Sequence, residues 1–380
     1  FYAVFHALDP NVFVDTHTSN GADYQYVMTL ISTQKDKLAR PLAELLTDDL
    51  EPYLFAQMAQ SGWEMTPYVN VFGTTPNDGF SAFLETPRYA SGYTALHNTI
   101  GFITEAHMLK PYPHRVAATE AFLQHICHYA SENAQKLKEA RAKAFVEDQR
   151  KDAFAISWEL DTTDIQKRSF KGYAYSYDPS SLGDFEQLHY HRDQPETFEV
   201  NYFPSYTATN SARVPKYYVV PQAWREVIER LQYNQVQMKM LPRDTFMEVS
   251  STYIEEFEFI KRPYEGHFLL KQMKTSAKVQ KRQFFKGDYL VSTEQAAVRF
   301  IVSVLEPEAV DSYLRWNFFD PIFQQKEYFS AYVFEETARE MLENSPALQK
   351  RFAEWKAAFP EMAKNPYAVL EFFYKQSPYY

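Results

Sequence analysis

The chain has 380 residues, of which 45% are hydrophobic, so it can bury a substantial core and is long enough for two domains. The same composition excludes a disordered chain. Its formal net charge of −10 gives no basic surface for nucleic acid, and no run of about eighteen apolar residues predicts a membrane span. Because Cys127 is the single cysteine, only His, Asp and Glu remain as possible ligands of a bound metal.

Residues 1–130 alternate between helical and strand patterns, which predicts an α/β domain with a mixed or parallel sheet. The expected helices are residues 1–8, residues 41–58 and a segment from about residue 113; the expected strands are residues 12–14, 69–72 and 99–104. Since the sequence starts inside the first of these helices, we expect more of this domain to precede residue 1.

Residues 131–153 are rich in charge and alanine, which predicts an exposed helical connector. Beyond them the pattern becomes aromatic-rich and alternating, which is typical of strands, and it turns helical again from about residue 327. We therefore predict an α+β, β-sandwich-like accessory domain over residues 154–380. The predicted fold class of the whole chain is α/β.

His17 directly follows the strand expected at residues 12–14 and begins a polar loop, with Asp15 two residues before it. A histidine at the carboxyl end of a parallel strand points into the crevice where α/β folds place their sites, which suits a metal ligand. On position alone, a loop histidine bonded to backbone groups is the simpler interpretation.

Glu105 ends the strand expected at residues 99–104. A carboxylate after a run of apolar and small residues is partly desolvated, which raises its pKa and suits it to accept a proton from a metal-bound water. For any single glutamate, a structural ion pair is the common alternative.

Three stretches together resemble the second half of the catalytic domain of bacterial zinc carboxypeptidases. They are residues 12–26, 87–93 and 101–112, and the resemblance covers residues 1–130, with a looser extension through the Trp-Asn-Phe-Phe-Asp segment at 316–320. It implies that His17 is the third protein ligand of one Zn²⁺ and that Glu105 is the general acid/base in hydrolysis of a C-terminal peptide bond. It also places Arg88 and Tyr89 where they would face the substrate, with Arg88 able to clamp a carboxylate.

The chain departs from this family in one respect: it contains no His-x-x-Glu motif, which supplies the family's first two zinc ligands. One histidine does not hold zinc tightly. We therefore predict that the other two ligands lie outside this chain and that residues 1–380 alone are inactive.

Two further functions stay open. A cell-wall peptide amidase would use the same residues on a related substrate, whereas a non-enzymatic module would bind glycan or protein through the aromatic-rich accessory domain, beside a relic catalytic domain. A row of exposed Tyr or Trp side chains would favour the binding module. The bacterial resemblance also implies export to the periplasm or the cell exterior.

Overall fold

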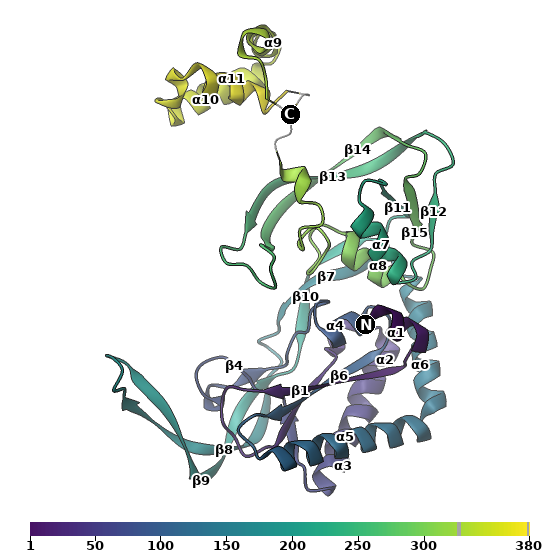
Figure 1. The fold of residues 1–380 in the computed structure, drawn as a ribbon, viewed down its shortest axis with the longest axis vertical. Helices are drawn as coiled ribbons and strands as arrows, with labels where there is room; N and C mark the ends of the chain where they lie inside the picture. The colour runs from purple at the N-terminus through teal and green to yellow at the C-terminus, as the bar shows by residue number, and fades with distance from the viewer. Residues whose placement is uncertain (325–327, 378–379) are drawn as a thin grey trace. The chain divides into compact units, whose positions relative to one another are not determined.

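The computed structural model describes residues 1–324, 328–377 and 380, and it divides into two compact units, Phe1–Phe318 and Phe319–Tyr380. Helices are interspersed with parallel and antiparallel strands through the first unit (Figure 1). The α/β class expected from the sequence is confirmed. The units do not divide at residue 154 as expected, because strands from both sides of that position share a sheet.

The first unit is organised around a four-stranded sheet in the order β1-β6-β2-β3. Its strands are β1 (Val12–Ser19), β6 (Ile100–His107), β2 (Met28–Ser32) and β3 (Met65–Pro67). β1 is parallel to β6, β2 is antiparallel to β6, and β3 is parallel to β2. The sheet is therefore mixed, and β1 forms one of its edges.

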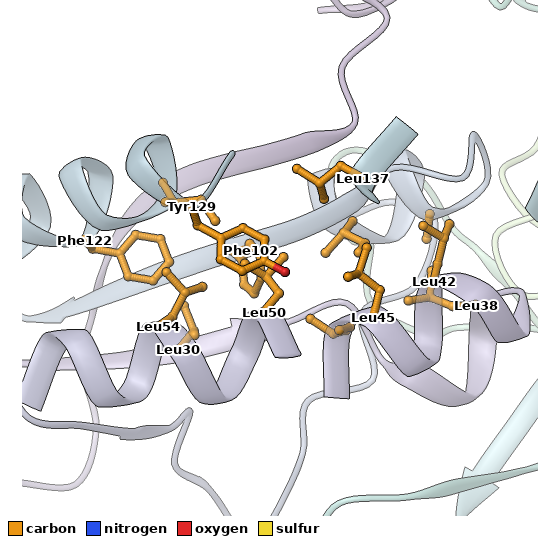
Figure 2. Packing of buried hydrophobic residues seen from close by; sticks show 14 of the residues in the cluster. Leu30, Leu38, Leu42, Leu45, Leu50, Leu54, Phe102, Phe122, Tyr129 and Leu137 are labelled. Atoms are coloured by element: carbon orange, nitrogen blue, oxygen red, sulfur yellow. The ribbon is translucent and has the colours of Figure 1, made fainter. Parts of the chain in front are cut away.

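Helices cover one face of this sheet and close the main hydrophobic core. They are α2 (Arg40–Leu45), the π-helical turn η2 (Leu46–Leu50), α3 (Glu51–Gln60), α5 (Tyr112–Glu132) and α6 (Ala134–Asp148). Fully buried leucines recur every four residues along the first three, at Leu42, Leu46, Leu50 and Leu54, so one helical face is apolar. Figure 2 shows Leu50 and Leu54 beside Phe102 of β6 and Phe122 of α5. Burial stabilises each such side chain by about 1.5–3 kcal/mol.

The helix α6 lies in the segment that the sequence predicts to be an exposed connector. It packs on α2 instead, because Leu137 and Ala144 lie two turns apart on one helical face and are both buried. Arg141, also buried, forms an ion pair with Asp9, at 2.6 Å between Nη2 and Oδ1. Residues 131–153 thus contribute to the core of the first unit.

A second four-stranded sheet, in the order β4-β5-β9-β8, joins distant parts of the chain. It contains β4 (Asn70–Val71), β5 (Phe80–Ser81), β9 (Glu186–Phe203) and β8 (Gln166–Pro179). Phe80 of β5 lies opposite Tyr202 of β9 in a parallel pair, and Phe80 packs with Phe170 in a buried aromatic cluster. This sheet is the reason why no separate accessory domain begins at residue 154.

The remaining strands form small sheets rather than the two facing sheets of a β-sandwich. They are β7 (Ala153–Leu160) with β10 (Tyr206–Arg213), β11 (Tyr217–Val220) with β15 (Tyr289–Ser292) and β12 (Met238–Met240), and the hairpin β13 (Thr245–Phe259) with β14 (Leu270–Phe284). The other helices of the unit are α1 (Tyr2–Leu8), η1 (Lys35–Lys37), η3 (Pro76–Asp78), α4 (Ala90–Ala95), α7 (Arg225–Tyr233) and α8 (Val298–Leu305).

The second unit is helical and has its own core. It contains η4 (Asp320–Phe323), α9 (Ala331–Glu343), α10 (Pro346–Ala358), η5 (Met362–Lys364) and α11 (Pro366–Tyr374). Phe334, Leu348 and Phe373 are buried together where the three long helices meet. The start of the predicted helical tail, at residue 327, lies outside the described residues. Among the described residues, no helix is both long and apolar enough to cross a membrane.

The neighbours Phe122 and Leu123 of α5 provide a test of this core. Phe122 is fully buried, whereas Leu123 is 39% exposed. We expect Phe122→Ala to lower the free energy of unfolding of the first unit by about 3–5 kcal/mol, because it leaves a cavity in the core. Leu123→Ala should change it by no more than about 0.5 kcal/mol. Urea denaturation of both variants measures this difference, and equal effects would contradict the described packing of α5.

Candidate active site

The parallel pairing of β1 with β6 separates apolar from polar side chains. Val14 of β1 lies opposite Phe102 of β6 and packs with it on the helix-covered face. Because side chains alternate along a strand, Asp15 and His17 project from the opposite face, together with Glu105. The register places His17 directly opposite Glu105. The two residues singled out from the sequence are therefore next to each other, on neighbouring strands and on the same face.

His17 lies within β1 rather than in the loop expected after it, and Glu105 lies within β6 rather than at its end. β1 continues to Ser19 and β6 to His107, because the two strands keep pairing beyond their apolar segments. The polar side chains in this part of β1 point to the face opposite α3 and α5, and they interrupt the hydrophobic pattern without ending the pairing of the strands.

Asp15 orients the imidazole of His17. The distance between Asp15 Oδ2 and His17 Nε2 is 2.9 Å, and the two side chains are 35% and 49% exposed. An Nε2–H that donates to a carboxylate leaves Nδ1 as the unprotonated nitrogen of a neutral imidazole. Histidines that bind metals in proteins are commonly held by a carboxylate in this way. His17 thus shares one feature, a carboxylate that holds its ring, with metal-binding histidines.

Glu105 is the one residue of β6 that is not fully buried. Burial raises its pKa above the ordinary value for a glutamate; the neighbouring His17 acts in the opposite direction, and Asp15 adds to the increase. A carboxylate with a raised pKa retains a proton more readily near neutral pH. This is the property that a residue needs in order to accept a proton and return it within one reaction.

Two tyrosines beside Glu105, Tyr24 and Tyr68, are not predicted from the sequence as site residues. Burial raises the pKa of Tyr24 to about 12, and the pKa of Tyr68 is raised by burial and by the charge of Glu105. Tyr68 follows β3, a strand that the sequence analysis does not predict, since it places a strand at residues 69–72. The alternation of β3 is too short to show a period, so nothing in the local pattern indicated that Tyr68 would lie near Glu105.

Tyr89 and Arg88 have different surroundings. Tyr89 packs edge-on against Phe83, which in turn packs against Tyr68, so a chain of aromatic rings connects Tyr89 to the vicinity of Glu105. Arg88 donates from Nε and Nη2 to Asp311 Oδ1, at 2.9 and 2.5 Å. Its guanidinium also lies 5.1 Å from the ring centroids of Tyr264 and Trp316.

Asp311 therefore occupies the edge of Arg88 that the family resemblance assigns to a substrate carboxylate. Although burial alone would raise the pKa of Asp311, hydrogen bonds from Arg88 and Thr86 hold it below the ordinary value. In this structure Arg88 connects the segment before α4 to the region around Trp316. The geometry gives Arg88 a structural part, whereas Tyr89 contacts Phe83, which packs against Tyr68.

A complete metal site is not present in the part of the chain that the structure describes, where no three His, Cys, Asp or Glu side chains are close enough to hold an ion. Next to His17, the outer edge of β1 has no partner strand within residues 1–324. Phe1, Val4 and Leu8, in the segment that precedes β1, are 61%, 64% and 73% exposed, and the ring of Phe1 contacts Phe13 of β1. An unpaired edge flanked by exposed apolar side chains is suited to receive a further strand.

Comparison with known proteins supports a partial, carboxypeptidase-like relationship. A stretch of 99 residues is 28% identical to the proteins named carboxypeptidase 2 of Trichophyton tonsurans and Trichophyton equinum. The matched stretch is 26% of this chain and 18% of each fungal protein, which is far less than two thirds of their length. No family model matches the chain, and no solved structure matches it.

The pair of Arg88 and Asp311 makes stability depend on pH. The carboxylate of Asp311 is only 2% exposed, so Arg88→Ala leaves a buried charge without its partner, at a cost of roughly 3–5 kcal/mol near pH 7. The pKa of Asp311 is lower in the folded state, so this stabilisation is present above about pH 4 and is lost as the pH falls through the folded-state pKa.

Denaturant titrations at neutral and acid pH measure this effect, and we expect the difference between wild type and Arg88→Ala to shrink in acid. Arg40→Ala is the matched control, because Arg40 pairs with Glu44 on the surface, where such pairs contribute less than about 1 kcal/mol. A loss that stays the same at both pH values would contradict the role of the charged pair.

Proposed function

We propose that the protein carrying residues 1–380 is a zinc-dependent hydrolase that removes C-terminal residues from peptides. The observation that carries the proposal is the register of β1 and β6, which places His17, with Asp15 bonded to it, opposite a half-buried Glu105. The partial identity to the fungal proteins named carboxypeptidase 2 supports the class of reaction. Export to the periplasm or the cell exterior, and cell-wall peptides as substrates, belong to the same proposal.

His17 fits zinc as one ligand, since Asp15 fixes its tautomer. The described residues do not supply a full set, so we propose that the other ligands come from polypeptide that pairs with the open edge of β1. Zinc, when bound, acts as a Lewis acid that polarises a carbonyl and makes water a better nucleophile. Placement at this edge would bring the added ligands to the face that carries His17 and Glu105.

Glu105 is the residue proposed to move the proton. Its carboxylate accepts a proton from the attacking water and then donates it to the departing amine, which its raised pKa favours. Asp15 keeps the ring of His17 in place throughout. Tyr68, a neighbour of Glu105, and Tyr89, which is connected to Tyr68 through Phe83, are proposed to border the bound peptide.

Replacement of Glu105 tests its part in the reaction. We expect Glu105→Gln to lower kcat/KM of peptide hydrolysis by roughly a hundred- to ten-thousand-fold, because the amide cannot accept the proton. In the wild type, the rate should fall in acid at a pH above the ordinary pKa of a glutamate. The matched control is Glu120→Gln on the exposed side of α5, which should retain activity. Full activity in Glu105→Gln would overturn the proposal.

Zinc affinity tests the part of Asp15. We expect Asp15→Asn to weaken zinc binding about ten- to a hundred-fold, because the amide holds the tautomer of His17 less firmly. His17→Ala should abolish binding. Competition with a chelator, on the whole protein that carries residues 1–380, measures both constants. Absence of stoichiometric zinc in that protein would overturn the metal-dependent function.

One observation favours a binding module as a second candidate. Tyr175 and Tyr177 on β8 are 38% and 42% exposed, and their ring centroids are 6.0 Å apart. Tyr190 of β9 lies opposite Tyr175 and contacts it. Exposed tyrosines in a group are typical of surfaces that bind sugars or peptides. If the protein proves to bind glycan while containing no zinc, this second function would replace the first.

A further inference from the structure

A cavity of about 450 Å³ opens between the end of β2, the helices η2 and α3, and the sheet that contains β8 and β9. Its volume is in the range of sites for small molecules. Phe55, Tyr68 and Phe83 provide apolar wall. Tyr68 is also a neighbour of Glu105, whereas Glu105 and His17 do not line the cavity. The cavity is therefore distinct from the candidate active site but adjoins it.

Arg168 offers an unused guanidinium to this cavity. Its Cζ lies 5.1 Å from the ring centroid of Tyr202, and in the described part of the chain no acceptor or carboxylate lies within bonding distance of the guanidinium, although its charge acts on the Glu51 carboxylate. Its neighbours on β8 differ, since Lys167 pairs with Glu199 and Lys171 with Glu64. A guanidinium held against an aromatic ring, with its donors free, is a receptor for a carboxylate.

Glu51 supplies a carboxyl group on the wall formed by α3; burial raises its pKa, whereas the hydrogen bond from Ser32 and the charges of Arg168 and Lys35 act in the opposite direction. Within the described residues its carboxylate accepts one hydrogen bond, from Ser32 Oγ at 2.7 Å, so acceptor capacity remains for a ligand. Lys35, which also lines the cavity, is paired with Asp36 and Ser205. A ligand with only a negative charge would be repelled by Glu51, and a ligand with only a positive charge would be repelled by Arg168. A ligand with both charges would satisfy both side chains.

We propose that this cavity binds the zwitterionic head of an α-amino acid, with the carboxylate at Arg168 and the ammonium group at Glu51. The apolar wall would receive an aliphatic or aromatic side chain. The ligand is either a free amino acid or an amino-acid group carried by a larger molecule. The proposal concerns binding alone and does not depend on zinc or on hydrolysis.

Three probes on one scaffold test it by calorimetric titration of the metal-free protein. L-Leucine carries both charges, N-acetyl-L-leucine only the carboxylate, and L-leucinamide only the ammonium group. We expect L-leucine to bind at least about ten-fold more tightly than either blocked form, since each blocked form leaves one charged side chain without its partner. Equal affinity for the three, or no binding of any, would overturn the proposal.

Substitutions then test which side chain binds the carboxylate and which binds the ammonium group of the ligand. Arg168→Leu should remove the preference for L-leucine over L-leucinamide, and Glu51→Gln should remove the preference over the N-acetyl form. Lys167→Leu is the matched control, because Lys167 pairs with Glu199 and does not line the cavity. Should Arg168→Leu change the circular dichroism spectrum, Arg168→Lys, which keeps the charge but loses the bidentate geometry, replaces it. A preference unchanged in these variants would contradict the assigned contacts.

Discussion

In the ladder between β1 and β6, residue 14 lies opposite residue 102 and residue 17 opposite residue 105. The burial of Val14 and Phe102 against the helices sets this register. The register in turn determines which side chains are neighbours on the opposite face of the sheet. A shift of β1 by one residue would turn His17 toward the hydrophobic core, away from Glu105, and would expose Val14. The hydrophobic pattern that stabilises the sheet is thus also what aligns the candidate catalytic groups, with no contribution needed from the loops.

Buried ion pairs hold the later part of the chain to this sheet. Arg299 of α8 donates to Asp148 of α6 from Nε and Nη2, at 2.8 and 2.5 Å, and Asp148 also accepts from Asn98. Together with Arg88 and Asp311, this pair joins segments more than a hundred residues apart in sequence. Removal of one member of a buried pair costs far more than the pair contributes as a whole. Residues 1–318 therefore form one unit despite their many small sheets.

The positions of His17 and Glu105 could be predicted from the sequence, but the side chains that surround them could not. Apolar runs ending in His17 and Glu105 are local patterns, and a parallel sheet brings the ends of such strands together. The pairing of Arg88 with Asp311 spans 223 positions and leaves no local trace, so the arginine looked free to bind substrate. Tyr68 was missed because β3 is three residues long. The pairing of β5 with β9 could not be predicted either, because the residue pattern of a strand does not indicate which other strand it pairs with.

The open edge of β1 also bears on how such a protein reaches its native state. An uncovered strand is a template to which any extended polypeptide can add, and like edges on two molecules can add to each other. Under the proposed function, a strand that pairs with β1 and brings the added zinc ligands beside His17 would end this hazard at the same moment. Protection from aggregation and completion of the site would then be a single folding event, and a chain delayed at that step would be at risk of aggregation and inactive at the same time.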